Sequence, residues 1–306
     1  MTLRKIRNAI TLNMIGKYFC LVQPEDLIHF TDNGSVPPVQ IYMITRRPRI
    51  TLDPATLKVT GELITGNFRV YRGRSTESHG FTMLNQLGTS EIRIESPAPH
   101  NMFYVYDEND EVISMGKAAN LIPLCKEPLE DLLDLEVMYV GQTFGLEAAR
   151  TSLNKIGDIK TLQAVCSDIE CKTPDQEVWL VLWHFEQLSG PAAANPEFMS
   201  QEEEAVFLEK ILGQNVSLKQ AENFTEAALI QFFAPEYNNT SIYNLENKAA
   251  ETYPGCYSLD VDSIIIELNM EELSCRLWSP QVEPEIMHYV HFSLNSSQER
   301  ENLFAF

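Results

Sequence analysis

The chain has 306 residues and a formal net charge of −20, with 44% hydrophobic and 22% charged residues. This length allows a large core and favours two domains, and the composition is that of an ordinary globular protein. Six cysteines are too few for a disulfide scaffold. A run of about 18 apolar residues is absent, so no transmembrane helix and no membrane partner are expected. The basic N-terminus lacks the apolar core of a secretory signal, so a cytoplasmic protein is expected.

The charge is distributed unevenly along the chain. Residues 1–125 contain 13 Lys and Arg against 12 Asp and Glu, whereas residues 126–306 contain 10 against 31. This difference predicts a domain boundary near residue 125. The acidic part would repel a phosphate backbone, so any nucleic acid is expected to bind the arginines of the N-terminal part. The alternative is that these arginines are only the solvent-exposed ends of two strands. These arginines form two groups, Arg46, Arg47 and Arg49, and Arg69, Arg72 and Arg74.

Residues 1–125 are predicted to be rich in β-strands. Four segments are rich in β-branched and aromatic residues with partial alternation, at 39–47, 63–72, 91–95 and 102–107. The polar residues 108–111 then lead into a further strand, which predicts a hairpin.

Residues 126–306 are predicted to mix helices with strands. Helical composition extends over 146–169, 201–212 and 221–233. A short β-branched and aromatic run at 177–185 predicts a buried strand. Three further strands are expected at 263–268, 275–278 and 288–294. The whole chain is therefore predicted to belong to the α+β class.

The helix predicted at 221–233 carries the most specific sequence of the chain. Glu226 begins the run EAALIQFFAPEYN, in which the apolar periodicity stops at Pro235 and a polar turn follows. A helix places Glu226 on the same side as Leu229 and Ile230, at the edge of a core. A metal ligand needs such a rigid position. The ordinary alternative is a buried helix with one glutamate at its rim.

This run resembles the closing segment of GIY-YIG nucleases, especially the type found in the incision subunit of bacterial nucleotide-excision repair. The upstream run MYVGQT at 138–143 is similar to the second strand of that family. The resemblance covers roughly residues 136–238. It implies a GIY-YIG-like small antiparallel sheet flanked by helices, between a β-rich N-terminal domain and a β-rich C-terminal extension.

The resemblance also implies a chemistry, the metal-dependent hydrolysis of DNA phosphodiester bonds with Mg²⁺ or Mn²⁺. Glu226 would be the metal ligand and Tyr139 would position the water. Gly141 would permit a close approach of the backbone, and Asn238 would brace the site. One carboxylate suffices, because Mg²⁺ keeps several waters and takes other ligands from substrate phosphates.

Two residues compete for the arginine that contacts phosphate in this family. Arg150 matches by its spacing from Gly141, whereas the run RTSLNKIGDIKTLQ places Lys155 at that position. The same run places Ile159 where a histidine is usual. Lysine is a point charge without the planar fork of arginine, and isoleucine cannot transfer a proton.

The first-strand tyrosine is assigned to the predicted hairpin. Tyr104 would be this tyrosine, and Gly116 then competes with Gly141 for the glycine of the second strand. Gly141 is preferred, because it retains the tyrosine before it and is followed by a helix with a basic residue.

Two functions are consistent with these residues. The first is a metal-dependent endonuclease acting on DNA, in a setting such as bacterial defence. The second is a catalytically degenerate interaction protein, whose acidic half binds a protein partner or a second copy of the chain, or mimics nucleic acid. Glu226, Tyr139 and Asn238 favour the nuclease. Lys155, Ile159 and the acidic charge favour the interaction protein.

Overall fold

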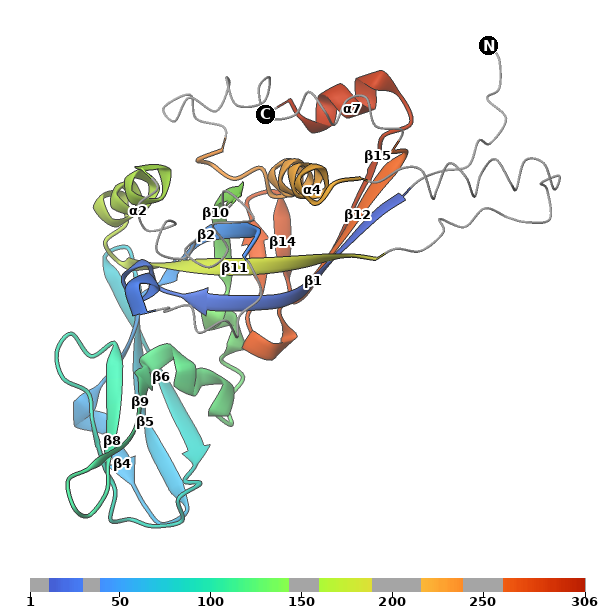
Figure 1. Ribbon diagram of the computed structural model, residues 1–306. Helices are drawn as coiled ribbons and strands as arrows, with labels where there is room; N and C mark the ends of the chain where they lie inside the picture. Colours follow the sequence, from blue (N-terminus) through green and yellow to red (C-terminus); the bar gives the residue numbers. More distant parts are fainter. Residues whose placement is uncertain (1–10, 30–38, 143–159, 189–215, 239–260, 306) are drawn as a thin grey trace.

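The computed structural model describes residues 11–29, 39–142, 160–188, 216–238 and 261–305 (Figure 1). Its largest sheet has eight strands in the order β14-β13-β10-β2-β11-β1-β12-β15. A second sheet has the order β3-β5-β4 with β6 beside β5, and a third has the order β7-β8-β9. The strands are β1 Thr11–Val22, β2 Ile41–Pro48, β3 Ile50–Leu52, β4 Lys58–Val59, β5 Leu63–Arg72, β6 Ser75–Leu84, β7 Arg93–Glu95, β8 Met102–Tyr106, β9 Val112–Lys117, β10 Leu135–Gln142, β11 Gln176–Leu188, β12 Ser263–Asn269, β13 Leu277–Ser279, β14 Val282–Glu285 and β15 Met287–Ser293.

Helices complete a mixed structure, as the predicted α+β class requires. The α-helices are α2 Lys160–Lys172, α4 Leu218–Phe233 and α7 Ser297–Leu303. The 3₁₀ helices are η1 Pro24–His29, η2 Pro54–Thr56, η3 Ala118–Leu124, η4 Glu130–Leu133 and η8 Glu271–Leu273. In the part of the chain that the structure describes, no helix has the length and apolarity needed to cross a membrane.

Strand β2 lies inside the large sheet, between β10 and β11, and is antiparallel to both. Its successive residues Ile41, Tyr42, Met43 and Ile44 are all buried, because both faces of the sheet are covered. Tyr42 and Ile44 pack in the cluster that includes α2, whereas Ile41 and Met43 pack in the larger cluster that includes the smaller sheets and α4. Figure 1 shows α2 and α4 on one side of the large sheet and the smaller sheets on the other.

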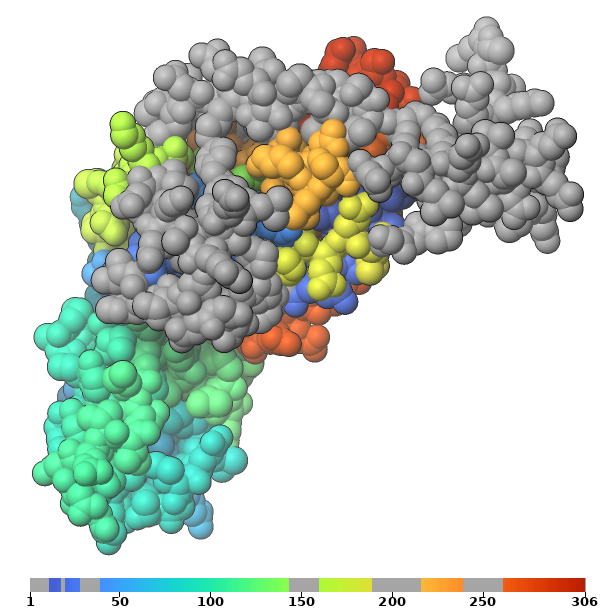
Figure 2. Space-filling view, in the orientation of Figure 1, coloured from blue at the N-terminus to red at the C-terminus, as the bar shows by residue number. Residues whose placement is uncertain are grey.

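The large sheet is not the small antiparallel sheet that was predicted. Strands from the C-terminal segment join it at two places, and β12 runs parallel to β1 while β13 runs parallel to β10. The sheet also takes β1 and β2 from the N-terminal part, so the boundary predicted at residue 125 does not divide it. The two smaller sheets project from the large one as a lobe (Figures 1 and 2).

Helix α4 has strong signals at both ends. Ser217 caps its start, because the Ser217 hydroxyl accepts a hydrogen bond from the Gln220 backbone amide while Gln220 Oε1 accepts one from the Ser217 backbone amide. The helix ends at Ala234, which has a left-handed φ of 43°, and Pro235 follows. The predicted helix is thus confirmed and begins three residues earlier than expected. Its buried residues pack on the large sheet and hold Glu226 in place.

Candidate functional site

Two tyrosines face each other across adjacent strands of the large sheet. Tyr42 of β2 and Tyr139 of β10 have ring centroids 5.8 Å apart, and their side chains are 2% and 3% exposed. Gly141 lies opposite Tyr42 in the register. A Cβ atom at Gly141 would lie 2.7 Å from Tyr139 Cε1 and 3.0 Å from Tyr42 Cζ. A glycine is therefore required here, because any side chain would displace the two rings.

The hydroxyls of this pair are held in their neutral form. Burial raises the pKa of Tyr42 well above its ordinary value, and the neighbouring Tyr139 and Glu226 raise it further. Burial and then the charge of Glu226 also raise the pKa of Tyr139. The hydrogen bond between the two side chains raises the pKa of Tyr42 but lowers that of Tyr139. The two hydroxyls are therefore hydrogen-bonded to each other within the field of the Glu226 carboxylate.

Helix α4 places a carboxylate beside these tyrosines. Gln142, the last residue of β10, donates from Nε2 to Glu226 Oε2 at 2.6 Å and to Asn223 Oδ1 at 3.0 Å. Its Oε1 accepts a hydrogen bond from Lys219 Nζ. The three helix residues lie on one face of α4, because their spacing is close to whole turns. Gln142 thus fixes the position of Glu226 from the strand side.

The turn after α4 is bound to the middle of β10. Asn238 Oδ1 accepts from the Val140 amide at 2.8 Å, and Asn238 Nδ2 donates to the Val140 carbonyl at 2.9 Å. The Tyr237 amide donates to the Met138 carbonyl at 3.1 Å. The Tyr237 hydroxyl donates to Asp168 Oδ2 of α2 at 2.6 Å. One buried asparagine therefore sets the position of α4 relative to the strand that carries Tyr139.

The structure brings four of the predicted site residues together in one place. The fifth, Tyr104, lies in a different sheet. Tyr139, Gly141, Glu226 and Asn238 form the group described above. Tyr104 lies in β8, in the three-stranded sheet, where it pairs with Glu95 and Met115. The position beside Tyr139 that was predicted for Tyr104 belongs to Tyr42. Three predicted positions, Arg150, Lys155 and Ile159, lie outside the described residues.

Tyr42 and Gln142 are the site residues that the sequence analysis missed. The signal for Tyr42 was present, since Gln40-Ile41-Tyr42 differs from Gly-Ile-Tyr only by glutamine in place of glycine. It lies in a strand that was predicted correctly. Residues 49–134 separate this strand from β10, so the two halves of the pair do not form a hairpin. No comparable pattern marks Gln142, whose partners are on α4.

Ion pairs occupy most of the arginines that were predicted to hold nucleic acid. Four of the six are paired, which leaves less positive charge for phosphates. Arg49 and Arg74 have no ion pair within the described ranges. The four pairs are Arg46–Glu136 at 2.7 Å, Arg47–Glu177 at 2.8 Å, Arg69–Asp53 at 2.8 Å and Arg72–Glu77 at 3.4 Å.

The donor atoms near Glu226 are of the type that Mg²⁺ prefers. They are the Glu226 carboxylate and the Asn223 amide oxygen, which both accept from Gln142 Nε2, and hard cations take oxygen ligands. Among the described residues, no group of three or more His, Cys, Asp and Glu side chains could hold a metal ion. Comparisons with family models, with curated proteins and with solved structures found no match.

Proposed function

We propose that this chain is a metal-dependent endonuclease of the GIY-YIG type that hydrolyses DNA phosphodiester bonds. The observation that carries the proposal is the buried pair of Tyr42 and Tyr139 beside Glu226. The elements β2, β10, α2, β11 and α4 follow one another as strand, strand, helix, strand and helix, which is the order that the resemblance implies. Residues 49–134 are then an insertion between the two tyrosine strands.

Glu226 would hold the cation, with the neighbouring Asn223 completing the oxygen donors. When bound, a divalent cation polarises a phosphoryl oxygen and lowers the pKa of its water. Gln142 keeps the carboxylate in place through its hydrogen bond to Glu226 Oε2. This contact restricts the rotamers of Glu226, and a side chain that binds a metal ion directly needs to be held in one orientation by its neighbours.

The tyrosines would act as hydrogen-bond donors in this site. A tyrosine is protonated at neutral pH, and the raised pKa values of Tyr42 and Tyr139 keep both hydroxyls protonated in alkaline solution as well. One hydroxyl of the hydrogen-bonded pair would donate to the other, and the second would donate to the attacking water or to a phosphate oxygen. Asn238 keeps this geometry by joining the turn after α4 to Val140, one residue from Tyr139.

Nicking of supercoiled plasmid with Mg²⁺ or Mn²⁺ tests the proposal. We expect wild-type protein to nick the plasmid and Glu226→Gln to lose at least about 100-fold in rate. Glu236→Gln is the matched control, because Glu236 is an exposed carboxylate in the turn after the same helix. The proposal is rejected if folded wild-type protein does not nick, or if Glu226→Gln nicks as fast as Glu236→Gln.

The second candidate function is a degenerate member of the same fold that binds a basic protein. It is supported by the pairing of Arg46, Arg47, Arg69 and Arg72 with acidic side chains and by the acidic charge of residues 126–306. Calorimetric titration with polylysine at two salt concentrations tests it. Saturable, salt-sensitive binding without nicking would favour this function. Nicking without such binding would eliminate it.

A further inference from the structure

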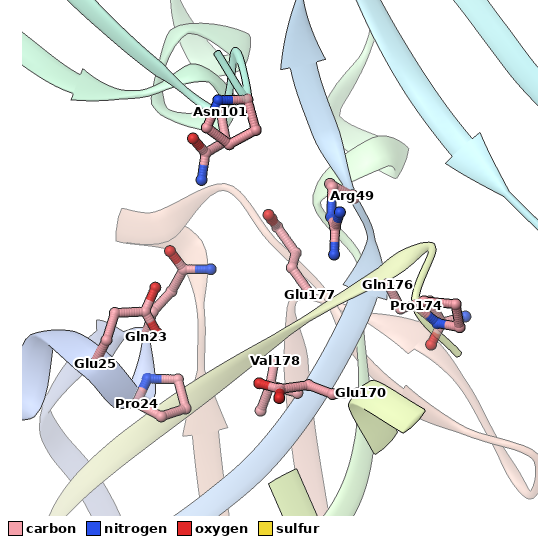
Figure 3. Close-up of a pocket in the computed structure, with 11 residues that line it drawn as sticks. Gln23, Pro24, Glu25, Arg49, Asn101, Glu170, Pro174, Gln176, Glu177 and Val178 are labelled. Atoms are coloured by element: carbon pink, nitrogen blue, oxygen red, sulfur yellow. The ribbon is translucent and has the colours of Figure 1, made fainter. Parts of the chain in front are cut away.

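A cleft of about 360 Å³ lies at the opposite end of β2 from the tyrosine pair (Figure 3). It is bordered by η1, the end of α2, the start of β11 and the loop before β8. Tyr42 and Arg49 are seven residues apart, which corresponds to roughly 20 Å along a strand. The cleft is therefore separate from the proposed nuclease site. Its lining residues are Gln23, Pro24, Glu25, Arg49, Pro99, Asn101, Glu170, Pro174, Gln176, Glu177 and Val178.

Two glutamines of this cleft have buried oxygens without a hydrogen bond. Gln23 is only 6% exposed, and its Oε1 has no partner among the described residues. The same is true of the Oε1 of Gln176. A buried polar atom without a partner costs about 1–3 kcal/mol, so its presence in a folded protein requires a reason. Figure 3 shows the Gln23 carboxamide at the wall of the cleft, where a half-turn of the amide exchanges its acceptor for its donor.

The cleft also contains two charged side chains of opposite sign that form no ion pair in the described part of the chain. Arg49 and Glu170 are both exposed, and neither forms an ion pair within the described part of the chain. Glu177 is already bound, since its Oε1 accepts hydrogen bonds from Arg47 and Trp179. Arg49 enters the cleft from the end of β2, whereas Glu170 comes from α2 (Figure 3). A ligand in this cleft would therefore meet opposite charges on different walls.

The apolar part of the lining narrows the ligand class. It consists of Pro24, Pro99, Pro174 and Val178, and no aromatic ring is among the described lining residues. Bases are commonly held by stacking on aromatic rings, so a free nucleobase is disfavoured. The volume lies at the small end of the range for ligand sites.

We propose that this cleft binds a small zwitterionic ligand of the amino-acid class. The guanidinium of Arg49 binds its carboxylate, because the planar fork of arginine matches a carboxylate in two hydrogen bonds. The carboxylate of Glu170 binds its ammonium group. The carboxamides of Gln23 and Gln176 also line the cleft, and a turn of either amide presents its oxygen to the N–H donors of the ligand.

Isothermal titration calorimetry of the full chain tests the ligand class. The probes are glycine, glutamine, glutamate and arginine, with acetate and methylammonium as the two halves of a zwitterion. We expect at least one amino acid to bind with a Kd of about 1 mM or lower, and acetate and methylammonium to bind at least about tenfold more weakly. The proposal is overturned if none of the four amino acids binds at about 10 mM, or if either half binds equally well.

Two variants test the site itself. Arg49→Met is expected to weaken binding by at least about tenfold. Arg74→Met is expected to leave it unchanged, because Arg74 is exposed, lies outside the cleft and has no ion pair with any described residue. Gln23→Leu removes a buried polar atom without a partner, so it is expected to abolish binding while raising the Tm of the ligand-free protein. Unchanged binding in Arg49→Met or in Gln23→Leu contradicts the site. A lower Tm in ligand-free Gln23→Leu would contradict the claim that Gln23 Oε1 is buried without a hydrogen bond.

Discussion

The β2–β10 pair and the β8–β9 hairpin contain the same local arrangement with different chemistry. In each, an aromatic ring on one strand lies opposite a glycine on the next, Tyr42 opposite Gly141 and Phe103 opposite Gly116. In the hairpin this ring belongs to phenylalanine, which has no hydroxyl. Tyr104 is the next residue along β8, so its side chain projects to the other face. In the hairpin the tyrosine is therefore one residue away from the position opposite the glycine, so this pair only packs, whereas Tyr42 and Tyr139 form a candidate catalytic pair.

The two regions also differ in how their strands are connected. A turn at residues 107–111 joins β8 to β9, whereas β2 and β10 are separated by more than one sheet. Local sequence patterns identify hairpins well, because the two strands and the turn appear in one short window. A pair of distant strands gives no such signal. The candidate catalytic tyrosines lie on β2 and β10, which are far apart in the sequence, so local sequence patterns cannot show that these strands are neighbours.

The largest effect expected from this comparison is on nicking. Tyr139→Phe and Tyr42→Phe each remove a hydroxyl from the buried pair, so each is expected to slow plasmid nicking by about 100-fold or more. Tyr104→Phe is the matched control in the hairpin and is expected to keep the wild-type rate. Initial nicking rates at saturating Mg²⁺ measure the difference, and circular dichroism verifies that the variants are folded.

A loss of nicking in Tyr104→Phe with normal rates in the other two variants would reverse the comparison. It would return the first-strand tyrosine to the hairpin, as the sequence analysis had assigned it. Equal rates in all three would remove the tyrosines from the proposed mechanism and leave Glu226 to be explained by packing alone.

Much of the fold could be predicted from local patterns. Strand β5 has its predicted range, β8 ends one residue before its predicted end, β9 is the further strand predicted after residues 108–111, and the helix around Glu226 is confirmed. Strand β1 was missed. It contains Gly16, which resembles a break, but a Cβ there would lie 2.7 Å from the Trp183 ring. A glycine within a strand can mark such a close approach, and only the tertiary structure shows which ring it accommodates.

The candidate site was predicted in the same uneven way. Glu226 and Asn238 were found together, because α4 and its following turn form one continuous segment. Tyr139 and Gly141 were found in a second segment. The arrangement of the two segments, through Asn238 and Val140, could not be predicted because it depends on side-chain hydrogen bonds between residues that are 98 apart in the sequence.

The next largest effect is expected from the asparagine that fixes this arrangement. Asn238→Ala leaves the buried amide and carbonyl of Val140 without their partners, which is expected to lower the free energy of unfolding by about 3 kcal/mol. Asn109→Ala in the hairpin turn removes one exposed contact, from Asn109 Nδ2 to Asp107 Oδ2 at 3.3 Å, so a change within about 0.5 kcal/mol is expected. Urea denaturation of both variants measures the contrast. Equal stabilities would show that the Val140 contacts are replaced by water.

The two glycines provide a smaller and more direct test. Gly141→Ala places a methyl group against the Tyr139 and Tyr42 rings in the buried sheet, and overpacking of this kind costs about 1–3 kcal/mol. At Gly116 the nearest atom is Phe103 Cε1 at 3.0 Å, and the strand is partly exposed, so Gly116→Ala is expected to cost less. Thermal unfolding ranks the two variants. A larger loss at Gly116 would mean that the hairpin is the more tightly packed region.

The smallest effects are expected from two carboxyl groups whose pKa values shift in opposite directions. Burial raises the pKa of Glu222 on α4, Lys219 only partly offsets this, and the charge of Glu226 adds to it. Hydrogen bonds from the Glu111 and Asn109 backbone lower the pKa of Asp107 in the hairpin turn. The protein therefore loses stability as the pH rises above the ordinary pKa of glutamate, because the Glu222 carboxylate forms in a buried position. Asp107 acts in the opposite direction: its carboxylate stabilises the protein above the ordinary pKa of aspartate, and this stability is lost as the pH falls through the lowered pKa.

Substitution by the matching amide is consequently expected to act with opposite signs at pH 7. Glu222→Gln should raise the Tm and Asp107→Asn should lower it, each by roughly one or two degrees, because one or two weak interactions change in a large protein. Both differences should shrink at low pH, where the wild-type carboxyl groups are protonated like their amide replacements. Thermal unfolding at pH 7 and at low pH measures this. A drop in Tm for Glu222→Gln at pH 7 would show that the carboxylate near Glu226 is stabilised by Lys219 more than burial penalises it, and the acidic face of α4 would then be already neutralised within the protein.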